Sequence, residues 1–256
     1  MYCYKKIDFY KIKDKIIISF IMENKIKIIG FSGKLGVGKN YISEKIFGKK
    51  LYDMGYTVHI LAIADQTKYE LGSRFKIVDD ENNFTKEMNE IFDELFINKS
   101  ADARKKLQYY ATDYCRNGGN WIINNDFIMY NEPLIWIKGL YLQIKNILNK
   151  SYDVSKDVFI ITDVRFVNEA QFIKSLGGIV IRIESEIRNY KKMKDEAFKN
   201  CSSEKDIDKI IQLIKNHTSE TNLDIYTFNY TINNEPDITE NIASEIDLII
   251  DTFIRF

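Results

Sequence analysis

The chain has 256 residues, of which 45% are hydrophobic and 29% are charged, and its formal net charge at pH 7 is zero. This length is enough for one large domain with a full hydrophobic core. The charge balance indicates no nucleic-acid-binding or membrane-binding surface, so we expect neither partner. The three cysteines are widely spaced and lack a metal-ligand pattern, which fits a reducing compartment such as the cytoplasm.

Residues 1–21 precede the first predicted strand and mix lysines with aromatic and aliphatic residues. The apolar run 16–21 is too short to cross a bilayer, and no small-residue cleavage site follows it. The pattern therefore predicts neither a membrane span nor a secretory signal. We expect an appendage to a domain that spans 22–256, with an added edge strand as the alternative.

A phosphate-binding loop is predicted where an apolar strand meets a helix. The run 26–31 predicts a buried strand, Gly33, Gly36 and Gly38 follow, and a helical pattern starts directly afterwards. Glycines let backbone N–H groups turn toward a phosphate, and the N-terminus of the helix favours the same anion. Lys39 supplies a positive charge for the terminal phosphates. The alternative is a glycine-rich turn that binds no ligand.

The residue after this lysine departs from the common loop pattern. Asn40 stands where serine or threonine usually offers a hydroxyl to Mg²⁺. Its amide oxygen can still act as a ligand, so we interpret the loop as modified rather than inactive.

Beyond the loop, apolar runs alternate with helical patterns, which predicts an α/β fold with a parallel sheet. Strands are predicted over 57–64, 158–162, 179–183 and 228–232, and helices over 101–115, 134–149, 169–176 and 238–253. Most of 65–112 also has a helical pattern. The highly charged helical segment 184–216 is a candidate lid, with a solvent-facing helical excursion as the alternative.

Four polar residues follow one another in steps of four along the helix predicted over 101–115. Arg104, Gln108, Thr112 and Arg116 therefore share one helix face. Only seven of the 37 basic residues are arginines, so an arginine indicates a position that needs a planar, forked donor. The stripe predicts an anion-binding face, with an ordinary solvated face as the alternative.

A second candidate pair follows the strand predicted over 158–162. Asp163 lies at the carboxyl end of this strand, where ligands bind in open parallel sheets, and Arg165 is two residues further on. This placement suits a carboxylate that holds Mg²⁺ through water. The alternative is an aspartate that caps the next helix and pairs with the arginine.

Three further residues stay undecided at this level. His217 can be structural or catalytic, and Trp121 and Trp136 can belong to the core or touch a ligand.

Several sequence blocks together resemble the deoxynucleoside monophosphate kinases of large DNA phages and related viral enzymes. These blocks are FSGKLGVGKN (31–40), IADQTKYEL (63–71), ARKKLQYYATDYCR (103–116), ITDVRFVNEAQFIKSLGGIVIRI (161–183), HTSE (217–220) and YTINN (230–234). The resemblance implies a P-loop kinase fold with a five-stranded parallel sheet in the order 2-3-1-4-5 and helices on both faces. It also implies a monophosphate-binding arm within 65–157 and a lid within 184–216.

The resemblance further implies ATP- and Mg²⁺-dependent phosphoryl transfer to a deoxynucleoside monophosphate, for DNA precursor supply in the cytoplasm, or in the host cytoplasm if the protein is viral. ATP would be bound by Gly33, Lys34, Gly36, Val37, Gly38, Lys39, Asn40 and Tyr41. The acceptor nucleotide would be bound by Lys68, Arg104, Gln108, Arg116 and Arg165. Catalytic roles would fall to Lys39, Arg165 and a lid arginine, with Arg188 preferred over Arg182, and the metal to Asp163 through water and to Asn40.

Two alternatives remain beside this function. The first is a P-loop kinase for another small-molecule acceptor, and the second is a nucleotide-binding module without catalysis. The preferred base and the choice between a monomer and a homodimer are open at this level.

The loop interpretation predicts different outcomes at two neighbouring positions. We expect Lys39→Ala to abolish turnover, because it removes the charge that faces the phosphates. We expect Asn40→Ser to be tolerated, because the phosphates, water and Asp163 would chiefly hold the metal. Steady-state kinetics of the two variants test this, and the reverse result would overturn the interpretation of the loop.

Overall fold

The structure is a computed structural model. It describes residues 26–65, 67–68, 107–114, 116, 120–123, 126–129, 134–198, 204–237 and 239–255. The expectation for residues 1–21, and most of the helical pattern of 65–112, lie outside the described residues.

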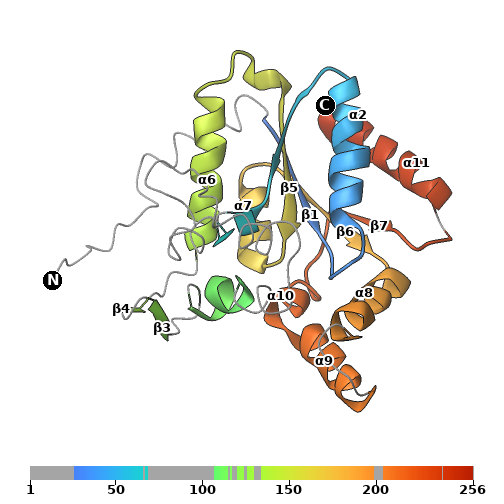
Figure 1. Ribbon diagram of the computed structural model, residues 1–256. Coiled ribbons are helices and arrows are strands. Elements are labelled where there is room, and N and C mark those ends of the chain that lie inside the picture. Colours follow the sequence, from blue (N-terminus) through green and yellow to red (C-terminus); the bar gives the residue numbers. More distant parts are fainter. Residues whose placement is uncertain are drawn as a thin grey trace, which may run out of the picture.

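Five parallel strands form the central sheet (Figure 1). They are β1 (Lys27–Ser32), β2 (Thr57–Leu61), β5 (Asp157–Val164), β6 (Ile179–Glu184) and β7 (Tyr230–Asn233). Their order across the sheet is β2-β5-β1-β6-β7, which in chain order is 2-3-1-4-5. The predicted fold class and strand order are therefore confirmed.

Helices cover both faces of this sheet (Figure 1), which is why its central strands read as continuous apolar runs. Neighbouring residues of β1 point to opposite faces, so Ile28 packs in one core and Ile29 in the other. The Ile28 core is covered by α6 (Ile135–Leu148) and α7 (Val167–Ser175). The Ile29 core is covered by η1 (Tyr41–Gly48), α2 (Lys49–Asp53), α11 (Thr239–Ile249) and η6 (Ile250–Ile254).

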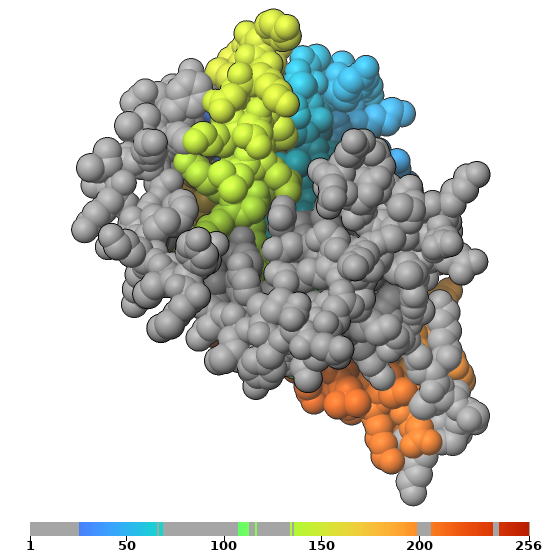
Figure 2. Space-filling view, turned by 60° about the vertical axis from the view of Figure 1, so that its left-hand side comes forward, coloured from blue at the N-terminus to red at the C-terminus, as the bar shows by residue number. Residues whose placement is uncertain are grey.

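The segment that the sequence marks as a candidate lid forms two helices, α8 (Glu186–Phe198) and α9 (Glu204–Asn216). They pack against each other through a small apolar cluster of their own, which also takes in Leu35 of the glycine loop. In the space-filling view, α9 projects at the end of the molecule opposite α6 (Figure 2). A short helix, α10 (Thr218–Thr221), leads from α9 toward β7.

Some local predictions differ from the structure. The second strand stops at Leu61 instead of residue 64, because residues 63–65 turn into a helical segment. A two-stranded antiparallel hairpin, β3 (Asn120–Ile123) and β4 (Asp126–Met129), was not predicted. The remaining described elements are η4 (Tyr109–Tyr114), within the helix predicted over 101–115, and η5 (Val154–Lys156). Within the described part of the chain, no helix combines the length and apolarity that crossing a membrane requires.

Two adjacent glycines at the end of α7 provide a matched test of packing. A Cβ on Gly178 would lie 2.5 Å from the backbone oxygen of Ile28 and 2.9 Å from that of Ile173, whereas Gly177 has φ +78° and no atom within 4 Å of its Cβ position. We expect Gly178→Ala to lower the free energy of unfolding by about 2–3 kcal/mol through overpacking. Gly177→Ala should cost only about 1–2 kcal/mol, from the left-handed backbone. Chemical denaturation of both variants checks the order, and a larger loss at Gly177 would contradict it.

Candidate functional site

The glycine loop connects β1 to η1 at the carboxyl edge of the sheet. Gly36 and Gly38 have φ values of +76° and +89°, a backbone conformation that residues with a side chain rarely adopt. The N–H groups of Gly36, Gly38 and Lys39 donate no hydrogen bond to any residue that the structure describes. The loop therefore offers a row of backbone donors beside a helix N-terminus, as an anion-binding loop requires.

Lys39 is folded back against this loop. Its side chain is only 8% exposed, and Nζ donates to the carbonyl oxygens of Gly33 at 2.6 Å and Lys34 at 3.0 Å. Burial, and then the positive charge of Arg165, lower the pKa of Lys39 from 10.5 to about 7. The ammonium is thus held in a site that penalises its charge until an anion arrives.

Side chains from distant elements donate hydrogen bonds to the backbone of the loop. Asn189 of α8 donates to the carbonyl oxygen of Leu35 at 2.6 Å, and Asn234, which follows β7, donates to that of Val37 at 2.7 Å. Arg188, the preferred lid arginine, uses Nε to bind the carbonyl oxygen of Asn234 at 2.7 Å. In this structure Arg188 therefore connects α8 to the segment after β7.

The two residues after the lysine lie at the surface. Asn40 Nδ2 donates to Glu44 Oε1 at 3.1 Å, and Tyr41 is 63% exposed. Within the described residues, neither side chain forms a hydrogen bond or ion pair with the loop interior, and the amide oxygen of Asn40 keeps its ligand capacity. The predicted roles of both residues stay predictions.

Asp163 lies at the carboxyl end of β5, as its sequence position indicates. Its Oδ1 accepts the N–H of Ile63 and its Oδ2 accepts that of Ala64, both at 2.7 Å. Asp163 therefore fixes the segment that follows β2, and it does not cap α7. Each carboxylate oxygen retains a lone pair, so a water-mediated role toward Mg²⁺ stays a prediction.

A cavity of about 160 Å³ opens beside Asp163. It brings together every described residue that the sequence assigns to the acceptor: Lys68, Gln108, Arg116 and Arg165. Thr112 also lines it, so the described members of the four-residue stripe share one face. Arg104 lies outside the described residues. Residues that are far apart in the chain thus form one polar cavity, which we call the acceptor cavity.

Arg116 is held in place by a glutamate that the sequence analysis did not single out. Its Nη2 lies 2.5 Å from Oε1 of Glu169, and its guanidinium stacks on the ring of Phe166 at 3.8 Å. Glu169 also accepts the N–H groups of Arg165 at 2.8 Å and Phe166 at 3.0 Å, so it closes the first turn of α7. Burial raises the pKa of Glu169, although the charge of Arg116 opposes this. The capping function predicted for Asp163 as an alternative thus belongs to Glu169.

Glu220 is the second residue that sequence reasoning missed. Its Oε2 accepts the N–H of Leu35 in the glycine loop at 2.8 Å, and its Oε1 pairs with Nη1 of Arg165. Although burial opposes ionisation, the charges of Arg165 and Lys39 hold the pKa of Glu220 below its usual range. The only sequence signal was its place in the HTSE block.

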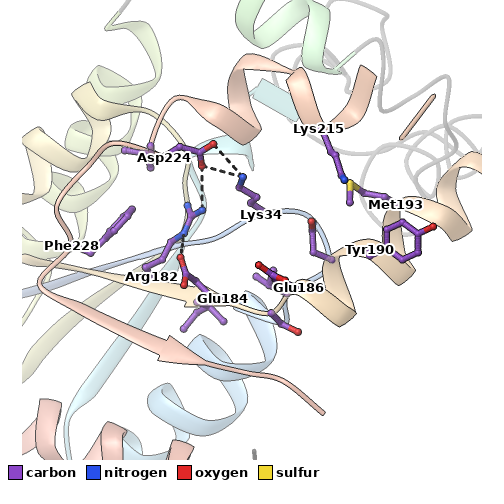
Figure 3. Close-up of a pocket in the computed structure, with 14 residues that line it drawn as sticks. Lys34, Arg182, Glu184, Glu186, Tyr190, Met193, Lys215, Asp224 and Phe228 are labelled. Carbon is purple, nitrogen blue, oxygen red and sulfur yellow. Dashed lines mark hydrogen bonds and ion pairs between the residues drawn. The ribbon is translucent and has the colours of Figure 1, made fainter. Parts of the chain in front are cut away.

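A larger cavity, of about 630 Å³, lies between the glycine loop and α8 (Figure 3). We call it the lid cavity. The buried Arg182 reaches it from β6, donating to Ser32 Oγ at 3.3 Å and lying 3.6 Å from carboxylate oxygens of Glu184 and Asp224. Lys34 Nζ also lies 3.2 Å from Oδ1 of Asp224. Arg182 thus belongs to β6 and lies in the wall of the lid cavity among side chains of both charges. It is not part of the lid helix α8.

The undecided residues receive definite places. Trp136 is 1% exposed and donates from Nε1 to the carbonyl oxygen of Ala111 at 3.0 Å, although one edge also lines the acceptor cavity. His217 caps α10, because its Nδ1 accepts the N–H of Ser219 at 3.2 Å. The side chain of Trp121 lies outside the described residues.

Among the residues that the structure describes, no three histidine, cysteine or acidic side chains converge in the manner of a metal site. The metal-binding roles predicted for Asp163 and Asn40 stay predictions.

The strand order, the glycine loop and its buried lysine define the fold of a P-loop kinase. Over 159 residues the chain is 28% identical to a protein of Acanthamoeba polyphaga mimivirus named "Putative deoxynucleotide monophosphate kinase", and the match covers 61% of this chain and 73% of that relative. This relative confirms the resemblance that the sequence blocks indicate. No protein-family model matches the chain.

Two solved structures also align with most of the chain. A shikimate kinase from Bacteroides thetaiotaomicron is 11% identical, with a TM-score of 0.38, and the alignment covers 88% of this chain and 96% of the other. The crystal structure of APE1195 is 9% identical, with a TM-score of 0.40, and covers 89% and 96% respectively.

The buried lysine predicts proton uptake on anion binding. Because its pKa is about 7 in the free protein, Lys39 is largely neutral above that pH, and a bound polyanion restores its charge by raising the pKa. We expect inorganic tripolyphosphate to bind with uptake of protons at about pH 8 and with little uptake at about pH 5.5. Calorimetry in buffers of different ionisation enthalpy measures this. Equal proton linkage at both pH values would contradict the assignment.

Proposed function

We propose that the protein is an ATP-dependent kinase that phosphorylates a deoxynucleoside monophosphate to the diphosphate, in the supply of DNA precursors. The observation that carries the proposal is the position of Arg165. Its guanidinium lines the acceptor cavity, and its charge also lowers the pKa of Lys39 in the glycine loop. One arginine thus lies between a site suited to ATP phosphates and a separate polar cavity for an acceptor. The name of the mimivirus relative supports the same substrate class.

The glycine loop fits the phosphates of ATP. Its N–H groups at Gly36, Gly38 and Lys39 are available as donors, and Lys39 supplies the charge. Bound Mg²⁺ would neutralise part of the phosphate charge, and Asp163 through water and Asn40 are the residues that would hold it.

The reaction needs little acid or base chemistry from the protein. An oxygen of the acceptor monophosphate attacks the γ-phosphorus of ATP, the new P–O bond forms, and the bond to the leaving ADP oxygen breaks. Because the attacking oxygen is already an anion, no general base has to remove a proton. Catalysis then depends on bringing two polyanions together in line and on neutralising the charge between them.

The acceptor cavity suits this task through its donors. Arg165 and Arg116 provide forked guanidinium groups, Lys68 an ammonium, and Gln108 an amide. Glu169 orients Arg116 and so fixes one of these donors before the acceptor binds. Arg104, four residues before Gln108 in the sequence stripe, is proposed to join them.

The proposal is tested by ADP release with ATP and each of dAMP, dCMP, dGMP and dTMP. We expect at least one monophosphate to stimulate release. Arg165→Ala should lower kcat/KM for that acceptor by about 1,000-fold, because the negative charge of the transferred phosphoryl group loses the guanidinium that neutralises it. Binding of ATP should persist.

Arg255→Ala serves as the matched control, because Arg255 is an exposed arginine that pairs with Asp251 in the same C-terminal turn. Its kinetics should equal those of the wild type. If no monophosphate stimulates ADP release, the nucleotide-kinase proposal fails. Turnover with another small phosphate or alcohol would then indicate a different acceptor, and ATP binding without any turnover would indicate a non-catalytic module.

A further inference from the structure

The short helix α10 and the residues directly after it contribute to both the acceptor cavity and the lid cavity. Ser219 lines the acceptor cavity, whereas Leu223 and Asp224 line the lid cavity. Glu220 lies between these contacts and is only 8% exposed. Its Oε2 accepts the N–H of Leu35 in the glycine loop. A buried carboxylate therefore connects the glycine loop to Arg165, which lines the acceptor cavity.

Three groups that favour an anion converge on this carboxylate. They are the N–H of Leu35, the guanidinium of Arg165 and the ammonium of Lys39. Against the effect of burial, the positive charges of Arg165 and Lys39 lower the pKa of Glu220. Arg165 and Lys39 repel each other, since the charge of Arg165 lowers the pKa of Lys39. Without a counter-charge, this repulsion would drive the side chain of Arg165 away from the loop.

We propose that Glu220 is a positioning residue for phosphoryl transfer, which holds the guanidinium of Arg165 close to the glycine loop. The proposal rests on the function proposed above. Glu220 acts through Arg165 and takes no proton in the reaction.

The hydrogen bonds of Arg165 suit this role. Its Nη1 pairs with Glu220 and also lies 3.4 Å from the carbonyl oxygen of Ser219. Within the described part of the chain, its Nε and Nη2 donate to no other residue. One edge of the guanidinium is thus fixed by α10, and the other edge is available to a phosphate.

The element that carries Glu220 is itself anchored. His217 caps α10, and Asn222 at its end accepts the N–H of Val167 in α7 at 2.8 Å. Glu169 in turn binds the backbone of Arg165. Arg165 is therefore held at its backbone by α7 and at its side chain by α10, as a preorganised catalytic group requires.

The kinetic test compares Glu220→Gln with the wild type. Glutamine keeps an oxygen for the N–H of Leu35 but removes the ion pair with Arg165. We expect kcat to fall between about tenfold and about 100-fold, because Arg165 loses its fixed geometry. The KM for ATP should not rise, because the substitution removes a negative charge beside the phosphates.

A double-mutant cycle separates positioning from a general structural effect. If Glu220 acts through Arg165, Glu220→Gln should add no further loss of kcat in an Arg165→Ala background. Asp157→Asn is the control, because Asp157 is a buried carboxylate paired with His59 at the opposite end of β5. Its kcat should match that of the wild type. An unchanged kcat in Glu220→Gln, or losses that multiply with Arg165→Ala, would overturn the proposal.

A readout without turnover separates this proposal from the proposed function. Nitrogen NMR of the guanidinium should show restricted rotation of Arg165 in the wild-type protein and faster rotation in Glu220→Gln, with backbone spectra that confirm the same fold. If the guanidinium is equally ordered in both proteins, Glu220 does not position it. If wild-type protein phosphorylates no acceptor but this difference persists, the proposed function fails and the positioning contact stands.

Discussion

The gathering of positive charge at the carboxyl edge of the sheet is the constraint on which the rest of this site depends. Beside the burial of Lys39, the positive charge of Arg165 lowers the pKa of Lys39, so the two cations repel each other in the free protein. Two buried glutamates supply negative charge beside these cations. Glu220 holds the side chain of Arg165, and Glu169 holds its backbone and the guanidinium of Arg116. Buried charge costs free energy unless it is paired, so these ion pairs keep the guanidinium groups of Arg165 and Arg116 ordered before any ligand binds.

The sheet topology brings these groups together. In the order β2-β5-β1-β6-β7, the first strand lies at the centre, and the segments that follow its neighbours meet around the glycine loop. Asp163 joins the ends of β5 and β2 through the N–H groups of Ile63 and Ala64. Asn189 and Asn234 secure the loop from the other side. With Glu220, which accepts the N–H of Leu35, three segments that are distant in the chain hydrogen-bond to the backbone of the loop and hold its conformation.

Most of the fold could be predicted from the sequence, because buried parallel strands appear as apolar runs and the helices between them as amphipathic patterns. The hairpin β3–β4 could not, since two four-residue strands give little periodic signal. Four of the residues predicted to bind the acceptor do share one cavity: Lys68, Gln108, Arg116 and Arg165. Glu169 and Glu220 were not singled out, because an acidic residue in a charged helical pattern looks like any solvated side chain until its neighbours in space are known.

The sequence by itself determined the α/β class, the position of the glycine loop and the resemblance to deoxynucleoside monophosphate kinases, because each of these depends on residues close together in the chain. Only the tertiary structure decided what the charged side chains contact. It tied Asp163 to the end of β2, Arg188 to the segment after β7 and Arg182 to the wall of the lid cavity. Glu220 lies 185 residues from Leu35 and 55 from Arg165 in the chain, so its ion pair and loop contact exist only after β1, β5 and α10 have packed together.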